Sequence, residues 1–234
     1  MKLGLSLGLE DNATALTWEP TDESSCLGWY KYGAGFTLVS DAVSVWNDQS
    51  SASNDATQTD AANRPDWNKN AVEFDGDTGG DPDHLDIPQV TLTGDLTVAV
   101  SIDLNAMGGV LLGDNDASNT EFIRFTATTE LRVRNQGNTA INLDLTNESF
   151  NNRGYLVVSR STVGGVANTW QMWWNGVKQT STAVMNDTCL YDVIGVRKPD
   201  NNALDGNIYE LQIFNSASDA LTDNINLRLG TLPL

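Results

Sequence analysis

Positively charged residues are scarce in this sequence. Its 234 residues include 13 Lys and Arg against 31 Asp and Glu, so the formal net charge at pH 7 is −18. Contact with a nucleic-acid backbone or an anionic membrane surface needs a concentrated basic footprint. The few bases are scattered along the chain, so we expect neither nucleic acid nor a membrane as a partner. Simple solubility and the gathering of divalent cations are two roles that the acidic surface leaves open.

Histidine and cysteine are also scarce. A single histidine, His84, excludes a zinc site built from several histidines and makes any Ser-His-Asp triad depend on one residue. We expect His84 at the surface or at a sheet edge. The two cysteines, Cys26 and Cys189, give no disulfide framework. We expect free thiols, and one bridge between them is the alternative.

Long apolar runs are missing too. No segment approaches the roughly 20 apolar residues of a membrane-spanning helix. Residues 1–9 lack the apolar centre and the small-residue cleavage site of a signal peptide. We therefore expect the chain to stay where it is made or to leave by lysis.

The first nine residues instead form a Leu-rich arm. Leu3, Leu5, Leu7 and Leu9 alternate with Gly or Ser, which places four leucines on one face of an extended strand. Such a face needs a partner, either the chain's own sandwich or a neighbouring subunit by strand addition. Because the following residues are polar, we divide the chain into an arm and connector over 1–25 and one domain over 26–234.

Alternation of apolar and polar residues dominates the rest of the sequence. In 96–104, five large apolar residues are separated by small or polar ones, which predicts a strand with one packed and one wet face. Residues 131–134, 141–145 and 209–213 repeat the pattern. Many short strands joined by polar turns, without alternating helices, indicate an all-β antiparallel sandwich.

Two local features refine this picture. Asn175-Gly176 favours a two-residue hairpin turn. Before it, Trp170, Met172 and Trp174 share one strand face, while Gln171 and Trp173 share the other. One face must pack, so Trp173 is the candidate platform for stacking on a sugar, and core or interface packing is the alternative.

One helix is expected near the end of the chain. Leu221, Ile225 and Leu229 fall at four-residue spacing. Thr222 is the expected cap of this helix, and Gly230 is its expected end.

An ordered series of motifs resembles laminin G-like, concanavalin A-like domains. The N-terminal part reads SVWNDQSS at 44–51, NDATQ at 54–58, RP at 64–65 and VEFDG at 72–76. Later, WWNGV at 173–177 and DGNIYEL at 205–211 look like that family's Asn-Gly hairpin and closing strand. The resemblance covers about residues 26–230 and departs at Ser51, where the family usually has Gly.

This resemblance implies a jelly-roll β-sandwich of two curved sheets. Lectins, glucanases, adhesion modules and virion proteins share that fold, so the fold does not choose among them. Glucanases of this family carry an E-x-D-x-(x)-E strand. The nearest string here is Glu73-Phe74-Asp75-Gly76-Asp77, but Thr78 follows it and the run enters a turn. We therefore name no catalytic residue and expect a non-enzymatic protein.

The acidic loop that follows this string is the candidate for a bound cofactor. Calcium takes six to eight oxygen ligands, which clustered carboxylates and turn carbonyls supply. The candidate calcium ligands are Asp75, Asp77, Asp81, Asp83 and Asp86. A solvated turn is the alternative.

The layout of the whole chain also resembles virion structural proteins of tailed phages from marine bacteria. That resemblance implies a capsid decoration or surface protein located in the virion, with an outward-facing sandwich. The arm would contact capsid or other virion proteins or sister subunits, and host surface polysaccharide would be a further partner. The alternatives are a free or adhesin-borne carbohydrate-binding lectin module and a glycoside hydrolase.

Overall fold

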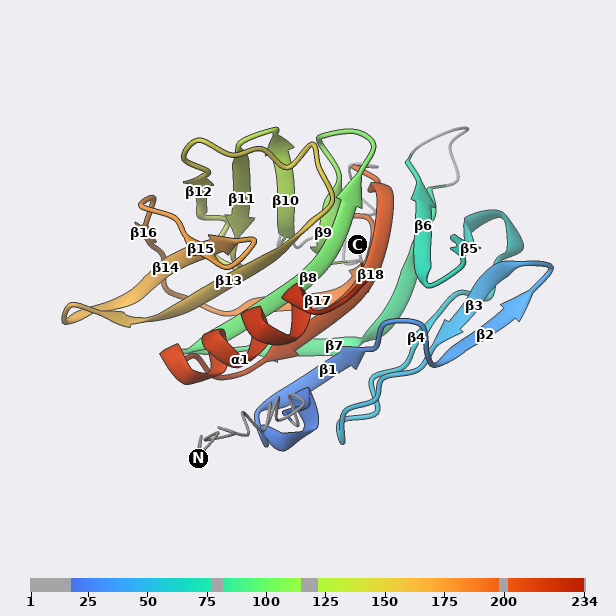
Figure 1. Cartoon of the computed structure of the whole chain (residues 1–234), viewed down its shortest axis with the longest axis horizontal. Coiled ribbons are helices and arrows are strands. Elements are labelled where there is room, and N and C mark those ends of the chain that lie inside the picture. Colours follow the sequence, from blue (N-terminus) through green and yellow to red (C-terminus); the bar gives the residue numbers. More distant parts are fainter. Residues whose placement is uncertain (1–17, 77–81, 115–121, 198–201, 234) are drawn as a thin grey trace, which may run out of the picture.

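The computed structural model describes residues 18–76, 82–114, 122–197 and 202–233. Every strand pairing within these ranges is antiparallel. The strands form a sandwich whose two layers are joined along one edge, and a helix lies across one outer face (Figure 1). The expected fold class, an antiparallel β-sandwich with one C-terminal helix, is confirmed.

The layer beneath the helix, here called the helix-side sheet, has the order β1–β18–β8–β13–β14, with β15 and β16 beyond β14. Its strands are β1 (Cys26–Tyr30), β8 (Leu96–Leu104), β13 (Gly154–Val163), β14 (Val166–Trp174), β15 (Val177–Lys178), β16 (Ala183–Val184) and β18 (Asp205–Phe214).

The opposite layer, the far sheet, has the order β4–β7–β17–β9–β10–β11–β12. Its strands are β4 (Ala56–Thr57), β7 (Leu85–Leu92), β9 (Val110–Gly113), β10 (Phe122–Ala127), β11 (Glu130–Arg134), β12 (Ala140–Asp144) and β17 (Cys189–Ile194).

Four strands join the two layers along one edge. They are β2 (Phe36–Val39), β3 (Ala42–Trp46), β5 (Asp66–Asn68) and β6 (Ala71–Asp75). β6 pairs with the first half of β18 and β1 pairs with its second half, while β3 pairs with β4 of the far sheet. Two 3-10 turns, η1 (Pro20–Asp22) and η2 (Ala61–Asn63), complete the described elements besides the helix.

The sequence pattern located these strands well. β8 has the expected bounds, and β11, β12 and β18 contain the other alternating segments almost completely. Asn175 and Gly176 have φ angles of 49° and 77° and connect Trp174 to its cross-strand partner Val177. Positive φ at both turn residues is what a type I′ hairpin requires.

The wet face expected for β8 is wrong. Thr97 and Ala99 are fully buried, and Ser101 is 2% exposed. The inward face of β8 belongs to the main core between the sheets, while Ala99 belongs to a second apolar cluster on the outer face. Small side chains at these outward positions leave room for a covering helix, which is why both faces of β8 are buried.

That helix is α1 (Asp219–Gly230). Leu221, Ile225 and Leu229 point into the second cluster, as their spacing predicts. The cap is Ser218 and not Thr222, because the Ser218 side chain accepts a hydrogen bond from the Leu221 N–H at 3.0 Å. Thr222 already donates its own backbone N–H to the Ser218 carbonyl inside the first turn. Gly230 is the last helical residue, as expected.

Both cysteines are buried thiols that form no disulfide, as expected. Cys26 lies in the second cluster and Cys189 lies in the main core. Burial raises the pKa of the Cys26 thiol to about 12, because a thiolate is poorly solvated there.

A buried ion pair fixes α1 to the sheet. The Glu210 carboxylate on β18 is fully buried, and Arg228 of α1 donates to its two oxygens at 2.6 and 3.1 Å. The Trp29 indole, the Tyr32 backbone N–H and the Gln212 amide donate to the same carboxylate. Such a charge is tolerable only when its partners are all present.

We expect Arg228→Leu to lower the free energy of unfolding by about 3–5 kcal/mol, because Glu210 would keep its buried charge and lose its cationic partner. Urea denaturation measures this loss. The matched control is Arg132→Leu, whose ion pair with Glu130 lies at the surface with side chains 39% and 25% exposed. The loss of unfolding free energy in Arg132→Leu should stay below about 1 kcal/mol. Equal losses in the two variants would show that the buried pair has no special role.

Candidate functional site

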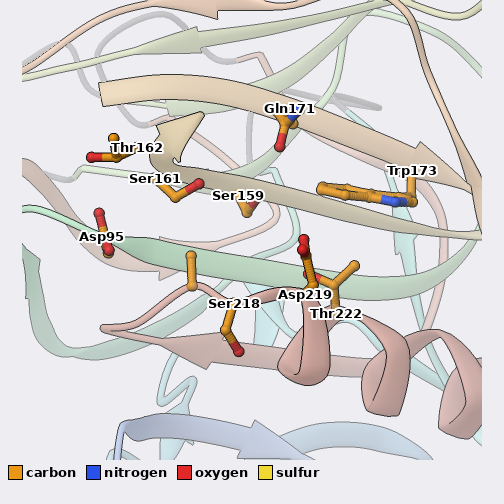
Figure 2. Close-up of a pocket in the computed structure, with 10 residues that line it drawn as sticks. Asp95, Ser159, Ser161, Thr162, Gln171, Trp173, Ser218, Asp219 and Thr222 are labelled. Carbon is orange, nitrogen blue, oxygen red and sulfur yellow. The ribbon is translucent and has the colours of Figure 1, made fainter. Parts of the chain in front are cut away.

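A pocket of about 230 Å³ opens on the outer face of the helix-side sheet, where α1 begins. Figure 2 shows side chains from β13 and β14 on one side of it and side chains from the first turn of α1 on the other. The lining residues are Asp95, Ser159, Ser161, Thr162, Gln171, Trp173, Ala217, Ser218, Asp219 and Thr222.

Strand register explains why a polar pocket forms here. Val157 on β13 pairs with Trp173 on β14, and both lie in the cluster that α1 covers. Two residues further along β13, Ser159 pairs with Gln171. Side chains two residues apart on a strand share one face. The outward face of β13 and β14 therefore changes from apolar residues beneath α1 to polar residues just beyond the start of α1.

Ser159 and Gln171 are the most informative residues of the pocket. They are 3% and 7% exposed, and neither side chain has a hydrogen-bond partner within the described residues. Neither side chain is among the enclosed polar groups that lack a partner in the described residues, so their polar atoms reach the open pocket. A hydroxyl and an amide that both donate and accept are thus held ready for a ligand that forms hydrogen bonds.

The charges around the pocket select the kind of ligand. Asp95 and Asp219 contribute carboxylates, and no Lys, Arg or His is among the ten lining residues. An anionic group would be repelled here. Carboxylates accept hydrogen bonds well from hydroxyl groups, so the pocket suits a neutral ligand rich in hydroxyls.

Trp173 is not the open stacking platform that we expected. Its side chain is only 8% exposed, since α1 packs against it within the second cluster. Lys178 Nζ also lies 5.0 Å from its ring centroid. Trp173 does share a face with Gln171, as predicted, and it lines the pocket as a partly covered wall.

The acidic loop is only partly described. Asp83 is 8% exposed and its carboxylate accepts a hydrogen bond from the Asp75 N–H at 3.1 Å, whereas the Asp86 side chain is 44% exposed. No group of three or more His, Cys, Asp or Glu side chains that could hold a metal ion occurs among the described residues. Asp77 and Asp81 lie outside them, so the five-residue calcium site stays a prediction.

His84, expected at the surface or a sheet edge, is instead buried, at 6% exposure. Its Nδ1 lies 2.8 Å from the Pro82 carbonyl oxygen, and its Nε2 lies 2.9 Å from the Gln58 amide nitrogen. A neutral ring that donates from Nδ1 and accepts at Nε2 satisfies both contacts. These contacts make His84 a structural residue of the loop.

Asp83 predicts a pH dependence of stability. Burial, followed by the nearby charge of Asp75, raises the pKa of Asp83 from 3.8 to about 7. The folded state therefore holds this proton more tightly than the unfolded state, and the resulting stability is full below about pH 4 and lost as the pH rises to about 7. The stability difference between wild type and Asp83→Asn, followed in urea across pH 4–8 with a chelator present, should fall over that window. Asp86→Asn is the exposed control, and an identical pH curve for wild type and Asp83→Asn would refute the prediction.

The remaining expectations concern the glucanase-like string, the Leu-rich arm and membrane-spanning helices. Phe74 of the glucanase-like string is fully buried on β6, and neither Glu73 nor Asp75 lines the pocket at α1. The leucines of the arm lie outside the described residues. No helix in the described ranges is long and apolar enough to cross a membrane.

Sequence reasoning missed most of the pocket. Asp95 and Asp219 are far apart in the sequence and line the same pocket only because of the tertiary fold, so no local sequence pattern predicts that they lie together. The usable signal was the change from Val157 to Ser159 at outward positions of one strand, opposite the Gln171–Trp173 face.

Comparisons with known proteins support the fold. No family model matches the sequence, and no curated protein matches it. Among solved structures, the binding domain of botulinum neurotoxin serotype C1 is similar, with a TM-score of 0.60 and 14% identity over 92% of this chain and 53% of that chain. The binding domain of Paraclostridial Mosquitocidal Protein 1 has a TM-score of 0.54 and 10% identity over 90% of this chain and 52% of that chain.

A third similar structure is the binding domain of botulinum neurotoxin DC in complex with SialylT. Its TM-score is 0.57, with 11% identity over 90% of this chain and 52% of that chain. This chain spans about half the length of the structures that it matches. At such low identities the likeness shows the fold alone, which is the lectin-like sandwich expected from the motifs.

Proposed function

We propose that this chain is a non-enzymatic, lectin-like module that binds a neutral sugar unit of a glycan in the pocket at the start of α1. The observation that carries the proposal is the pair Ser159 and Gln171, which are buried, face the pocket and have no partner within the described residues. Their polar atoms reach the pocket and are open to hydrogen bonds with a ligand that displaces water there.

The lining chemistry matches a pyranose ring. Neighbouring sugar hydroxyls both donate and accept, and the Gln171 amide with the Ser159 hydroxyl offers both functions side by side. The Asp219 carboxylate faces them from α1 and accepts from a hydroxyl (Figure 2). Trp173 adds an apolar wall for the C–H groups of the ring.

Proteins of similar fold support a glycan ligand. One is the neurotoxin binding domain in complex with SialylT, and another structure concerns botulinum neurotoxin type C, which interacts with two ganglioside molecules. The choice of pocket in this chain rests on its own residues. A binding role fits better than hydrolysis, because Glu73 and Asp75 of the glucanase-like string do not line this pocket.

A glycan array probed with the labelled chain tests the proposal, and each bound glycan is then titrated by calorimetry. We expect Gln171→Ala and Asp219→Asn each to weaken binding of a neutral glycan roughly tenfold, the cost of one well-placed hydrogen bond in a desolvated site. The matched control is Asp223→Asn, which changes an exposed carboxylate one turn further along α1, outside the pocket. No bound glycan, or equal affinity in Gln171→Ala and wild type, would sink the proposal.

We further propose that the module acts on the surface of a phage particle, with host surface polysaccharide as its glycan. The support is the layout of the sequence, with a Leu-rich arm and a polar connector ahead of the sandwich. An outward-facing pocket on the side of α1 is compatible with attachment through the arm.

Deleting residues 2–9, which removes Leu3, Leu5, Leu7 and Leu9, should abolish attachment to the particle and leave the sandwich folded. Attachment is measured as the copy number of the chain in purified particles by mass spectrometry, and folding by circular dichroism. Full copy number without the arm would refute its role, and absence of the intact chain from particles would refute the virion location.

A further inference from the structure

A second pocket, of about 420 Å³, lies away from the start of α1 and has the opposite charge character. It forms where Arg153, just before β13, meets Tyr209 of β18 and Lys69 in the turn between β5 and β6. Pro233, beyond the end of α1, closes one side. None of these residues belongs to the proposed sugar pocket.

An irregularity in β18 creates the aromatic wall of this pocket. The register between β18 and β8 shifts between Ile208 and Glu210, so Tyr209 stays half-buried beside a fully buried Glu210. Tyr32 stacks on Tyr209 with ring centroids 6.5 Å apart and an interplanar angle of 25°. A β-bulge commonly re-aims a side chain in this way.

Arg153 lies over this wall and keeps donors for other contacts. Its guanidinium carbon is 3.5 Å from the centroid of the Tyr209 ring, and Nη2 donates to the Pro233 carbonyl at 2.5 Å. The Nε is enclosed and has no partner, and no carboxylate pairs with Arg153 within the described residues. The outer Nη donors stay open to the pocket, and a guanidinium is suited to bind an oxyanion through them.

Lys69 adds a second positive charge. It is an exposed turn residue with a φ of 62°, and it makes no ion pair in the part of the chain that the structure describes. Two unpaired cations in one pocket stand out in a chain with 31 acidic and 13 basic residues. Asn68 and Asn70, which also line the pocket, each use an amide N–H within the protein and keep a carbonyl oxygen for other contacts.

The guanidinium is the largest single charge acting on this wall. Burial raises the pKa of Tyr209, and Arg153 lowers it, while Asp103, Tyr32 and Glu73 each act in the same direction as burial.

We propose that this pocket binds an oxyanion carried on a sugar ring, either the carboxylate of a uronic acid or a sulfate ester. Arg153 and Lys69 hold the oxyanion, Tyr32 contacts the ring, and the carbonyl oxygens of Asn68 and Asn70 accept from its hydroxyls. The chain then has two glycan subsites of opposite preference, one for a neutral unit and one for an acidic unit. This inference rests on the proposed glycan-binding function and names the class of glycan, a polysaccharide with acidic units.

Calorimetry with three oligosaccharides of equal length tests this site on the whole chain: an oligomannuronate, its carboxyl-reduced neutral counterpart, and a sulfated galactan fragment. Wild type should bind at least one acidic probe roughly tenfold or more tightly than the neutral probe, since a charge-assisted hydrogen bond to an oxyanion is worth at least that factor. The preferred probe identifies the oxyanion as carboxylate or sulfate. Arg153→Gln should remove the preference, and Arg132→Gln, an exposed arginine outside the pocket, should keep it.

Lys69→Asn provides a second variant that leaves the core untouched, because Asn tolerates the left-handed backbone of this turn. Lys69→Asn should reduce the preference for the acidic probe over the neutral probe at least threefold. Equal affinity of wild type for acidic and neutral probes, or a preference unchanged in both Arg153→Gln and Lys69→Asn, overturns the inference.

The experiments distinguish failure of the neutral-sugar pocket at the start of α1 from failure of the acidic-sugar pocket at Arg153. Neutral binding that depends on Gln171, without any acidic preference, overturns this inference and leaves the sugar pocket in place. Acidic binding that depends on Arg153, without neutral binding, supports this inference and overturns the pocket at the start of α1.

Discussion

The carboxylate of Glu210 lies where β1, β18 and α1 meet, and the outer surface of the sandwich depends on how its charge is satisfied. Arg228 reaches it from the last turn of α1, and Trp29 and Tyr32 reach it from β1 and the residues that follow. A buried charge that loses one partner becomes strongly unfavourable. Sliding α1 along the sheet would break both Arg228 hydrogen bonds to Glu210 and leave its buried charge without a cation, so the helix has one position.

That position shapes both pockets. At its start, α1 covers Val157 and Trp173 but stops short of Ser159 and Gln171, which leaves polar groups under an open space. At its end, the chain continues to Pro233, whose carbonyl accepts a hydrogen bond from Arg153 where its guanidinium lies over Tyr209. One ion pair near the end of the helix thus fixes the geometry of a neutral pocket at one end and a cationic pocket at the other.

The sequence predicted what depends on local pattern. Alternation found β8, β11, β12 and β18, and Asn175-Gly176 found the hairpin, because side-chain period and turn conformation are properties of neighbouring residues. The burial of Glu210 could not be found this way. Its place in the alternation of β18 looks like that of any outward polar residue, and its partner Arg228 lies 18 residues further on, on a different element.

The same limit applies to the candidate site. The strand pattern correctly placed Gln171 and Trp173 on one face, but whether that face is open depends on where α1 lies. Trp173 looked like an exposed platform for that reason and proved to be mostly covered. Arg153, Tyr209 and Lys69 come from three distant segments, so no spacing in the sequence links them.

The most direct test of the sugar pocket is to follow the indole N–H signals of the seven tryptophans by nitrogen–proton NMR while a bound oligosaccharide is titrated. Binding between α1 and β14 predicts a shift of the Trp173 signal. The Trp170 and Trp46 signals should stay in place, because those indoles donate to the Met185 and Ala34 carbonyls in the core. A shift at Trp67, which is 39% exposed on β5, with Trp173 unchanged would place the sugar elsewhere and contradict the proposal.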